Sequence, residues 1–406
     1  MKKRFKRVFL DYASTTPVDG KVFKKMKPYF HKNFGNPSAS YNEGILANQA
    51  ISKARQDIAT ICGVKDHEVI FTGSGTEANN LLFFGSIKAA ATEDHLKEKW
   101  ANNQLEIMVS EIEHPSVIEP VKNLEKENKA TINFLEVRED GIINLDLLSK
   151  SLNENTFLIS VILANNEIGT INPIREISSI VKKYKNKLGR SFDEPPYIHT
   201  DASQAPNFLD IHMDRLGVHA MTIDSSKIYG PKGAGCLIKK SYVPLSSIMY
   251  GGGQESNLRP GTENVPQIIG MSEALQIAQK QKDDFSKKMK NLQNYFISQI
   301  KNKFPVAKIN GSIKNRLPNN VNFCIEGLNS EFAVIQLDEL GVACSAATSC
   351  KGLSEDFSSY VVDSLYKTQE KNGASKCGQS SLRFTFGRGT TKRDIDFAIK
   401  ALSDII

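Results

Sequence analysis

A chain of 406 residues with 40% hydrophobic and 24% charged residues has the composition of a globular protein, long enough for one large and one smaller domain. The net charge of +7 is modest, and its one compact basic run, residues 2–7, fits a solvated terminus, so we expect no direct nucleic-acid binding. No apolar stretch reaches the length of a membrane span and no signal peptide is present, so we expect a cytoplasmic protein without membrane contact.

Short apolar runs alternate with helix-like segments through most of the chain. We expect strands at residues 69–71, 106–109, 157–163, 197–200 and 220–223, with helices beginning near Thr76, His114 and Pro173. Near-continuous apolar strands joined by helical crossovers indicate a mostly parallel sheet covered on both faces. The sequence therefore predicts an α/β fold.

A long periodic helix is expected from Pro266 to about Phe304, and shorter strands and helices follow it. We read this helix as the passage between two domains. The large domain is predicted to comprise residues 18–265, and the small domain residues 1–17 and 266–406.

The six cysteines show none of the paired spacing of a zinc site, so we predict no metal centre. In a reducing compartment we expect all six to be thiols, most of them small buried side chains. Cys350 differs because it lies among small and polar residues, 345–352, with no apolar stripe to bury it.

A glycine-rich turn leads from the strand at residues 69–71 into its helix. Residues 71–79 read Phe-Thr-Gly-Ser-Gly-Thr-Glu-Ala-Asn, which leaves backbone N–H groups exposed at a helix start, where the helix dipole favours an anion. The Thr76 hydroxyl, next to Gly75, can cap the helix or bind a phosphate. Walker and dinucleotide spacings are both absent from the turn. It indicates either a phosphate site or an ordinary helix cap.

Further polar candidates stand at strand ends. His114 begins a helix, where it is either a cap or a residue that stacks on an aromatic ring and moves protons. Asp201 lies at the carboxyl end of a strand, where it either opens an Asx turn or keeps a pyridine nitrogen protonated. Gln204 follows three residues later. Asn166 ends another strand. Arg383, within a late strand, can fork onto a carboxylate.

Lys227 follows the apolar run 220–223, ahead of a Gly/Pro turn and a further strand at 236–238. A lysine held there loses solvent, its ammonium form is less favoured, and the free amine can condense with an aldehyde. Pyridoxal phosphate (PLP) needs such a lysine and an acid against its pyridine nitrogen. Taken alone, the segment fits a surface lysine on a hairpin equally well.

These motifs belong to a longer series of segments in a fixed order: residues 10–17, 33–38, 72–77, 113–114, 165–169, 201–204, 227–233, 251–255, 259–262, Cys350 and 381–388. Together they resemble the cysteine desulfurases of the class V aminotransferase family, the NifS/IscS-like enzymes. The resemblance covers nearly the whole chain, and the combined order and spacing are far more specific than any single motif. It implies a PLP-dependent enzyme of fold type I, with a seven-stranded type of sheet in the large, PLP-binding domain.

The resemblance also implies roles around the cofactor ring. Lys227 would bind PLP covalently and later act on the Cα proton of the substrate, while His114 would stack on the ring and move protons. Asp201 would pair with the ring nitrogen, and Gln204 would hold the phenolate oxygen. Asn166 would lie beside both the cofactor and the substrate.

At the phosphate, the resemblance implies ligands from Gly75, Thr76 and the loop before Lys227, where Ser226 can donate one hydrogen bond. Thr262 would come from the other subunit of a homodimer.

At the substrate end, Asn166 and Arg383 would orient the carboxylate of L-cysteine. Cys350 would attack the substrate sulfur, leaving alanine and a Cys350 persulfide. Its polar, glycine-bearing surroundings fit a small-domain loop that carries sulfur outward. The acceptor would be an iron–sulfur scaffold or a tRNA-thiolation protein.

Two positions depart from the common family pattern. Ser226 stands where His is usual, and Asp224 stands where a phosphate-binding Ser is usual. An ionised Asp224 cannot donate a hydrogen bond and would repel a phosphate dianion, so it must turn aside, pair with a cation or be protonated. We therefore expect a variant phosphate site.

Other functions remain open from the sequence alone. Selenocysteine lyase and cysteine sulfinate desulfinase fit the same residues, whereas an ordinary aminotransferase has no need of Cys350. A catalytically inactive scaffold that binds a sulfur-transfer partner is supported only by the Asp224 and Ser226 departures. A nicotinamide dehydrogenase is remote, because no dinucleotide fingerprint opens the first crossover.

Overall fold

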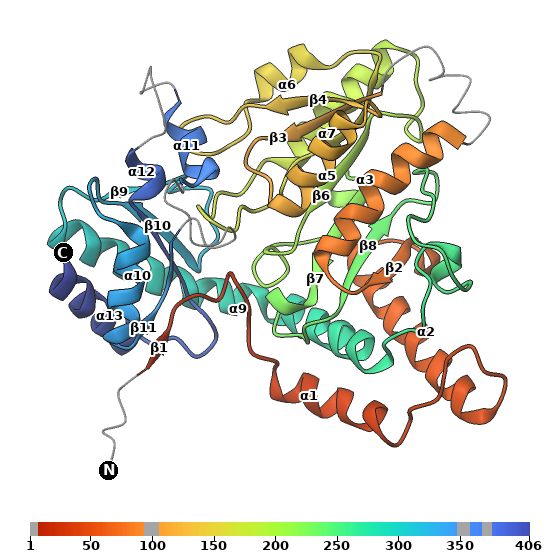
Figure 1. The fold of residues 1–406 in the computed structure, drawn as a ribbon, viewed down its shortest axis with the longest axis horizontal. Helices are drawn as coiled ribbons and strands as arrows, with labels where there is room; N and C mark the ends of the chain where they lie inside the picture. Colours follow the sequence, from red (N-terminus) through yellow and green to blue (C-terminus); the bar gives the residue numbers. More distant parts are fainter. Residues whose placement is uncertain (1–6, 93–104, 347–357, 368–375) are drawn as a thin grey trace.

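A seven-stranded sheet forms the centre of the larger part of the molecule (Figure 1). The computed structural model describes residues 7–92, 105–346, 358–367 and 376–406. In spatial order the strands are β2 (Val69–Thr72), β8 (Gly235–Lys239), β7 (Ala220–Asp224), β6 (Tyr197–Asp201), β5 (Thr156–Ser160), β3 (Glu106–Ser110) and β4 (Thr131–Leu135). Neighbours from β7 to β4 are parallel, whereas β8 runs antiparallel to β2 and β7. This confirms the predicted α/β fold with a mostly parallel sheet.

Alternating strand side chains divide between two helical layers, because successive residues of a strand point to opposite faces. In β2, Phe71 packs into the core beneath α2 (Asn42–Cys62), α7 (Ile174–Lys187) and the first half of α9 (Val265–Lys303). Ile70 packs into the core beneath α3 (Gly75–Thr92) and α5 (Pro115–Lys126). Met108 and Ile107 of β3 divide in the same way. The two layers also contain α6 (Leu145–Ser151) and α8 (Met213–Leu216).

The long helix α9 (Val265–Lys303) links the two parts of the molecule (Figure 1). Its first half packs into the core of the large sheet, and Phe296 and Ile300 of its second half pack into a separate core. The observed bounds agree with the predicted helix from Pro266 to about Phe304. Preceding it are α1 (Gly20–Met26) and the short 3-10 helices η1 (Lys27–Phe30), η2 (Asp66–Glu68), η3 (Ser225–Lys227) and η4 (Glu255–Asn257).

A smaller antiparallel sheet builds the second part. Its order is β12 (Ser345–Ala346), β13 (Ser381–Thr385), β10 (Asn320–Cys324) and β9 (Lys308–Ile309). Helix α10 (Ser330–Glu339) packs against β12 and β13, and α13 (Lys392–Ile405) packs against α9 and α10. The early strand β1 (Val8–Phe9) pairs in parallel with β11 (Val342–Ala343), so the red β1 lies beside the blue β11 in Figure 1.

The cysteines depart from the sequence-based expectation. Cys324 and Cys377 form a disulfide across 53 positions, which joins β10 to α12 (Lys376–Gln379), next to α11 (Tyr360–Tyr366). The expectation of six thiols is therefore wrong for this pair. The reason is tertiary: β10 pairs with β13 so that Cys324 lies opposite Ser381, four residues beyond Cys377. Cys62, Cys236 and Cys344 are buried thiols, and Cys350 lies outside the described residues.

Candidate active site

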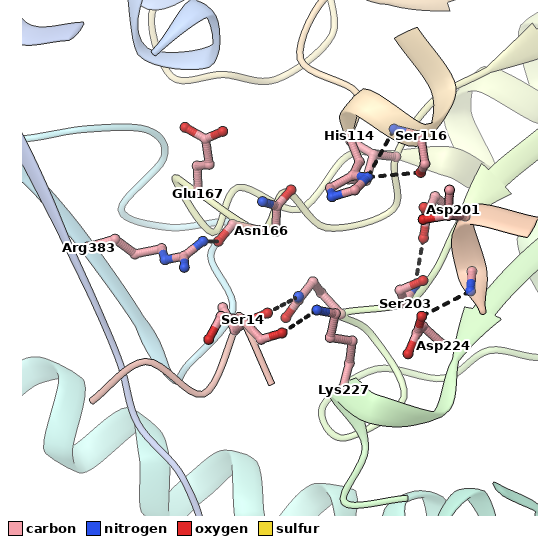
Figure 2. A pocket seen from close by; sticks show the side chains of 15 residues that line it. Ser14, His114, Ser116, Asn166, Glu167, Asp201, Ser203, Asp224, Lys227 and Arg383 are labelled. Carbon is pink, nitrogen blue, oxygen red and sulfur yellow. Dashed lines mark hydrogen bonds between the residues drawn. The ribbon is translucent and has the colours of Figure 1, made fainter. Parts of the chain in front are cut away.

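Eight of the predicted site residues line one cavity of about 220 Å³. It opens at the carboxyl ends of β5, β6 and β7, where parallel sheets bind ligands, and a turn from the N-terminal segment and one side chain of β13 close it. The predicted residues that line it are Gly75, Thr76, His114, Asn166, Asp201, Gln204, Lys227 and Arg383. Figure 2 shows side chains from both parts of the molecule pointing toward one another.

Asp201 supplies a buried carboxylate at the end of β6, with 6% of the residue exposed. Its Oδ1 accepts the backbone N–H of Ser203 over 2.9 Å, and its Oδ2 accepts the amide of Asn79 over 3.0 Å. These two hydrogen bonds fix the position of the carboxylate at the end of β6.

His114 caps the first turn of α5, and its ring lies on the cavity wall. Nδ1 accepts the backbone N–H of Ser116 over 3.1 Å and lies 2.8 Å from the Ser116 hydroxyl. In the neutral ring the proton is therefore on Nε2. Burial lowers the pKa of His114, and the positive charge of the nearby Lys227 lowers it further. The carboxylates of Asp201 and Asp224 act in the opposite direction.

Lys227 ends the short helix η3, which directly follows β7, so its predicted place between two strands is confirmed. The residue is half-buried, and its Nζ donates to the backbone carbonyl of Ser14. The same N-terminal turn is fixed to η3, because the hydroxyl of Thr16 donates to the carbonyl of Ser226 over 2.8 Å. On this side, Gln204 donates to the carbonyl of Ala13 over 2.9 Å.

The start of α3 forms the opposite end of the cavity. Here the N–H of Gly75 donates to Oδ2 of Asp224 over 2.9 Å, and the N–H and hydroxyl of Ser226 donate to Oδ1 over 2.8 and 2.6 Å. Ser226 therefore turns its hydroxyl to Asp224 and is not among the cavity-lining residues. Thr262 lines a different cavity of about 190 Å³, beside Arg259.

Arg383 enters the cavity from β13 and is 6% exposed. It donates to the carbonyl of Asn166 over 3.0 Å and forms an ion pair of 2.8 Å with Asp11. Its Nε is buried without a hydrogen-bond partner among the described residues. The guanidinium is thus shielded from water and can form paired hydrogen bonds with a carboxylate.

The sequence analysis did not identify the buried Glu167 as a site residue, although it lies within residues 165–169, one of the segments of the family resemblance. Its side chain lines the cavity and accepts the hydroxyl of Ser359 over 2.6 Å. Burial raises the pKa of Glu167 to about 7, against the lowering effects of the Ser359 hydroxyl and Arg383. It also missed Ser116 and Asn79, whose roles depend on contacts that only the folded chain makes.

Within the described residues, no group of three or more histidine, cysteine or acidic side chains is arranged to hold a metal ion. In the same part of the chain, no helix combines the length and apolarity that crossing a bilayer requires.

Comparisons with known proteins agree with this geometry. The family model described as aminotransferase class V matches residues 8–397. The chain is 37% identical over 401 residues to a cysteine desulfurase IscS of Dictyoglomus turgidum, covering 99% of this chain and 95% of that protein. A solved NifS-like protein superposes with a TM-score of 0.85 at 29% identity, covering 98% and 99% of the two chains. A structure described as SspA in complex with cysteine superposes with a TM-score of 0.72 at 28% identity, covering 93% and 98%.

Proposed function

The chain belongs to the class V aminotransferase family and is a cysteine desulfurase, and from this premise we propose that it uses PLP on Lys227 to move the sulfur of L-cysteine to Cys350. The observation that carries the proposal is the convergence of a lysine, a buried carboxylate and a buried arginine on one cavity, namely Lys227, Asp201 and Arg383. These residues come from segments far apart in the sequence, and each matches a different part of the complex between this cofactor and an amino acid.

The donor set of the cavity fits PLP at the ring and fits it less well at the phosphate. Asp201 would face the pyridine nitrogen, and Gln204 would lie near the phenolate oxygen. Gly75 and Thr76 would bind the phosphate at the start of α3, where the helix dipole favours an anion. Asp224 is the unfavourable element, because it accepts the N–H of Gly75. When bound, PLP supplies an electron sink that weakens bonds to Cα and Cβ of the substrate.

The chain's own side chains then handle the protons and the substrate carboxylate. Lys227 would take the Cα proton on Nζ, and the Nε2–H of His114 would serve as the donor on the other wall. Arg383 would bind the carboxylate of cysteine, assisted by Asn166, which it already contacts. Arg383 is buried, and its hydrogen bonds with the carboxylate gain strength from the exclusion of water.

We propose that Cys350 receives the sulfur. Its thiolate attacks the substrate sulfur, the Cβ–S bond breaks, and L-cysteine plus the Cys350 thiol become L-alanine plus a Cys350 persulfide. The candidate thiols within the described residues support this choice by elimination. Burial raises the pKa of Cys344, which disfavours the thiolate, and Cys377 is held in the disulfide.

We further propose a homodimer in which Thr262 reaches the site of the partner. Thr262 lies in a cavity that shares no residue with the Lys227 cavity, so its own chain does not use it there. Several large apolar side chains of the described residues are exposed and would be covered by a second subunit packed on them. They are Phe30, Phe34, Tyr41, Ile45, Leu46 and Tyr250.

The predicted domains are also retained as a proposal: 18–265 as the large domain, with 1–17 and 266–406 as the small one. The seven-stranded sheet lies within residues 69–239 and the four-stranded sheet within residues 308–385, which supports this division. A cytoplasmic location and an iron–sulfur scaffold or tRNA-thiolation protein as acceptor stay predictions.

One experiment tests the function directly. The purified protein is given L-cysteine without a reductant, and alanine is measured together with the mass of the peptide that contains Cys350. We expect about one alanine per site and a gain of one sulfur atom on that peptide, because a loaded persulfide blocks further turnover. Cys350→Ala should give almost no alanine, while the buried-thiol control Cys344→Ala should behave as wild type. Normal alanine formation by Cys350→Ala would contradict the proposal.

A further inference from the structure

Asp224 accepts three hydrogen-bond donors at the phosphate end of the cavity. They are the N–H of Gly75 at 2.9 Å, and the N–H and hydroxyl of Ser226 at 2.8 and 2.6 Å; we call these donors the cup. The proposed function assigns Gly75 to the phosphate, and the family resemblance implied a further donor from Ser226. A carboxylate of the chain itself therefore holds donors that were expected to bind the phosphate of the cofactor.

The fold places Asp224 in the cup from two directions. It ends β7, opposite Gly235 of β8, and its side chain caps the first turn of η3. Gly75 lies 149 positions earlier and begins α3, whose free N–H groups and dipole favour a negative charge. A Cβ on Gly75 would lie 3.2 Å from the Cβ of Asp224, tighter than most real contacts, so the glycine permits this close approach.

Phosphate and carboxylate compete for the same donors. Each N–H or O–H group makes one strong hydrogen bond, so it cannot serve both anions fully. A phosphate dianion placed beside an ionised carboxylate also meets direct repulsion. For a phosphate ester to enter the cup, Asp224 must give up its three bonds, and that loss is subtracted from the free energy of binding.

We propose that Asp224 is a built-in competitor that determines how much the phosphate group contributes to cofactor binding. The inference rests on the proposed function, because it takes PLP as the ligand. It predicts that wild-type protein binds PLP and phosphate-free pyridoxal with affinities within about tenfold of each other. In a cup free of a competing anion, the phosphate would contribute far more.

The first test compares these two ligands. Asp224→Asn keeps the size of the side chain and one acceptor oxygen while removing the charge. Absorbance titrations of the full chain would give the Kd of PLP and of pyridoxal for wild type and variant. We expect PLP to bind at least about tenfold more tightly to the variant, and pyridoxal to change by less than about twofold. Asp210→Asn, which removes the charge of a carboxylate paired with Arg215, is the matched control and should leave the ratio unchanged.

The second test measures phosphate binding alone, with no ligand that reacts with Lys227. Inorganic phosphate, compared with chloride at equal ionic strength, should raise the Tm of Asp224→Asn and of the shorter Asp224→Ser more than that of wild type, because a ligand that binds only the folded state stabilises it. The serine variant keeps the test decisive if the asparagine variant folds poorly.

Two results would count against the inference. One is that PLP binds the variants no more tightly than wild type, and the other is that phosphate stabilises them no better. In either case Asp224 only holds the donors of the cup in place and does not compete with phosphate for them. Failure of the proposed function would look different. Neither PLP nor pyridoxal would then produce a visible band in any variant, while the phosphate measurement would still report on Asp224.

Discussion

Ser116 directs the ring of His114: its backbone N–H donates to Nδ1 over 3.1 Å, and its hydroxyl lies 2.8 Å from the same nitrogen. The amide of Asn79 donates to the Ser116 hydroxyl oxygen over 2.8 Å and to Asp201 over 3.0 Å. The hydroxyl proton of Ser116 is thus left for His114. The residues proposed to face the ring and its nitrogen are therefore linked by one hydrogen-bonded chain.

Replacing Ser116 with alanine tests this link. The loss of one hydrogen bond, worth about 0.5–1.5 kcal/mol, should lower kcat about two- to tenfold with a smaller change in KM. Donors on Nδ1 disfavour a proton there, so removing one should raise the pKa of His114 and move the acid limb of the pH–rate profile to higher pH. Nitrogen NMR of the ring would report the same change. Ser116→Thr keeps the hydroxyl and should restore the wild-type profile; an unshifted limb in Ser116→Ala would exclude the positioning role.

Glu167 should make stability depend on pH. Burial raises its pKa to about 7 in the fold, above the ordinary value of about 4.3, so the folded state holds the proton more tightly than the unfolded chain. This contribution is complete below pH 4.3 and is lost as pH rises to 7. Glu167→Gln cannot ionise, so it does not lose this contribution. The free energy of unfolding of the variant minus that of wild type should therefore be up to about 3 kcal/mol larger at pH 8 than at pH 4.5.

Urea unfolding at these two pH values measures the difference for Glu167. The exposed Glu119 provides a control, because Glu119→Gln removes a carboxyl that water already solvates. A difference between Glu167→Gln and wild type that stays the same at both pH values would show that the fold does not raise the pKa of Glu167.

Lys227→Ala should abolish covalent cofactor binding without unfolding the chain. The side chain is half-buried, and its Nζ donates to the carbonyl of Ser14 rather than to a group of the hydrophobic core. We expect wild type with PLP to show a visible absorption band that borohydride abolishes, and the variant to lack that band at an unchanged Tm. Lys232→Ala, an exposed lysine in the following turn, should keep the band. A wild type that stays colourless with added PLP would contradict the cofactor assignment.

Local sequence patterns predicted the positions of many strands and helices, because these elements depend on residues that are neighbours in the sequence. The helix from Pro266 appears close to its expected bounds in α9, and the apolar run at residues 157–163 contains β5, which ends earlier than expected, at Ser160. Side chains at strand ends, such as Asp201, converge because parallel strands end at one edge of a sheet.

Long-range pairings could not be predicted in this way. The sequence placed Asp224 near a phosphate but offered no means of seeing that Gly75, 149 positions away, donates to it. The disulfide of Cys324 depends likewise on the register of β10 and β13. Such contacts follow from tertiary packing, which no local motif records.

Active sites shared between two subunits should be restored in part when two different inactive variants are mixed. Thr262 and Lys227 line separate cavities of one chain, yet both are proposed to serve the cofactor, so each site should combine Lys227 of one subunit with Thr262 of the other. Lys227→Ala and Thr262→Asp should each be inactive, the second because a carboxylate would face the phosphate. After subunit exchange of an equal mixture, half of the dimers carry one of each chain. In a twofold-symmetric dimer, one of their two sites holds both lesions and the other is intact, so activity should recover to about a quarter of wild type. Either full activity of Thr262→Asp alone or no recovery on mixing, with exchange verified by mass, would rule out the shared site.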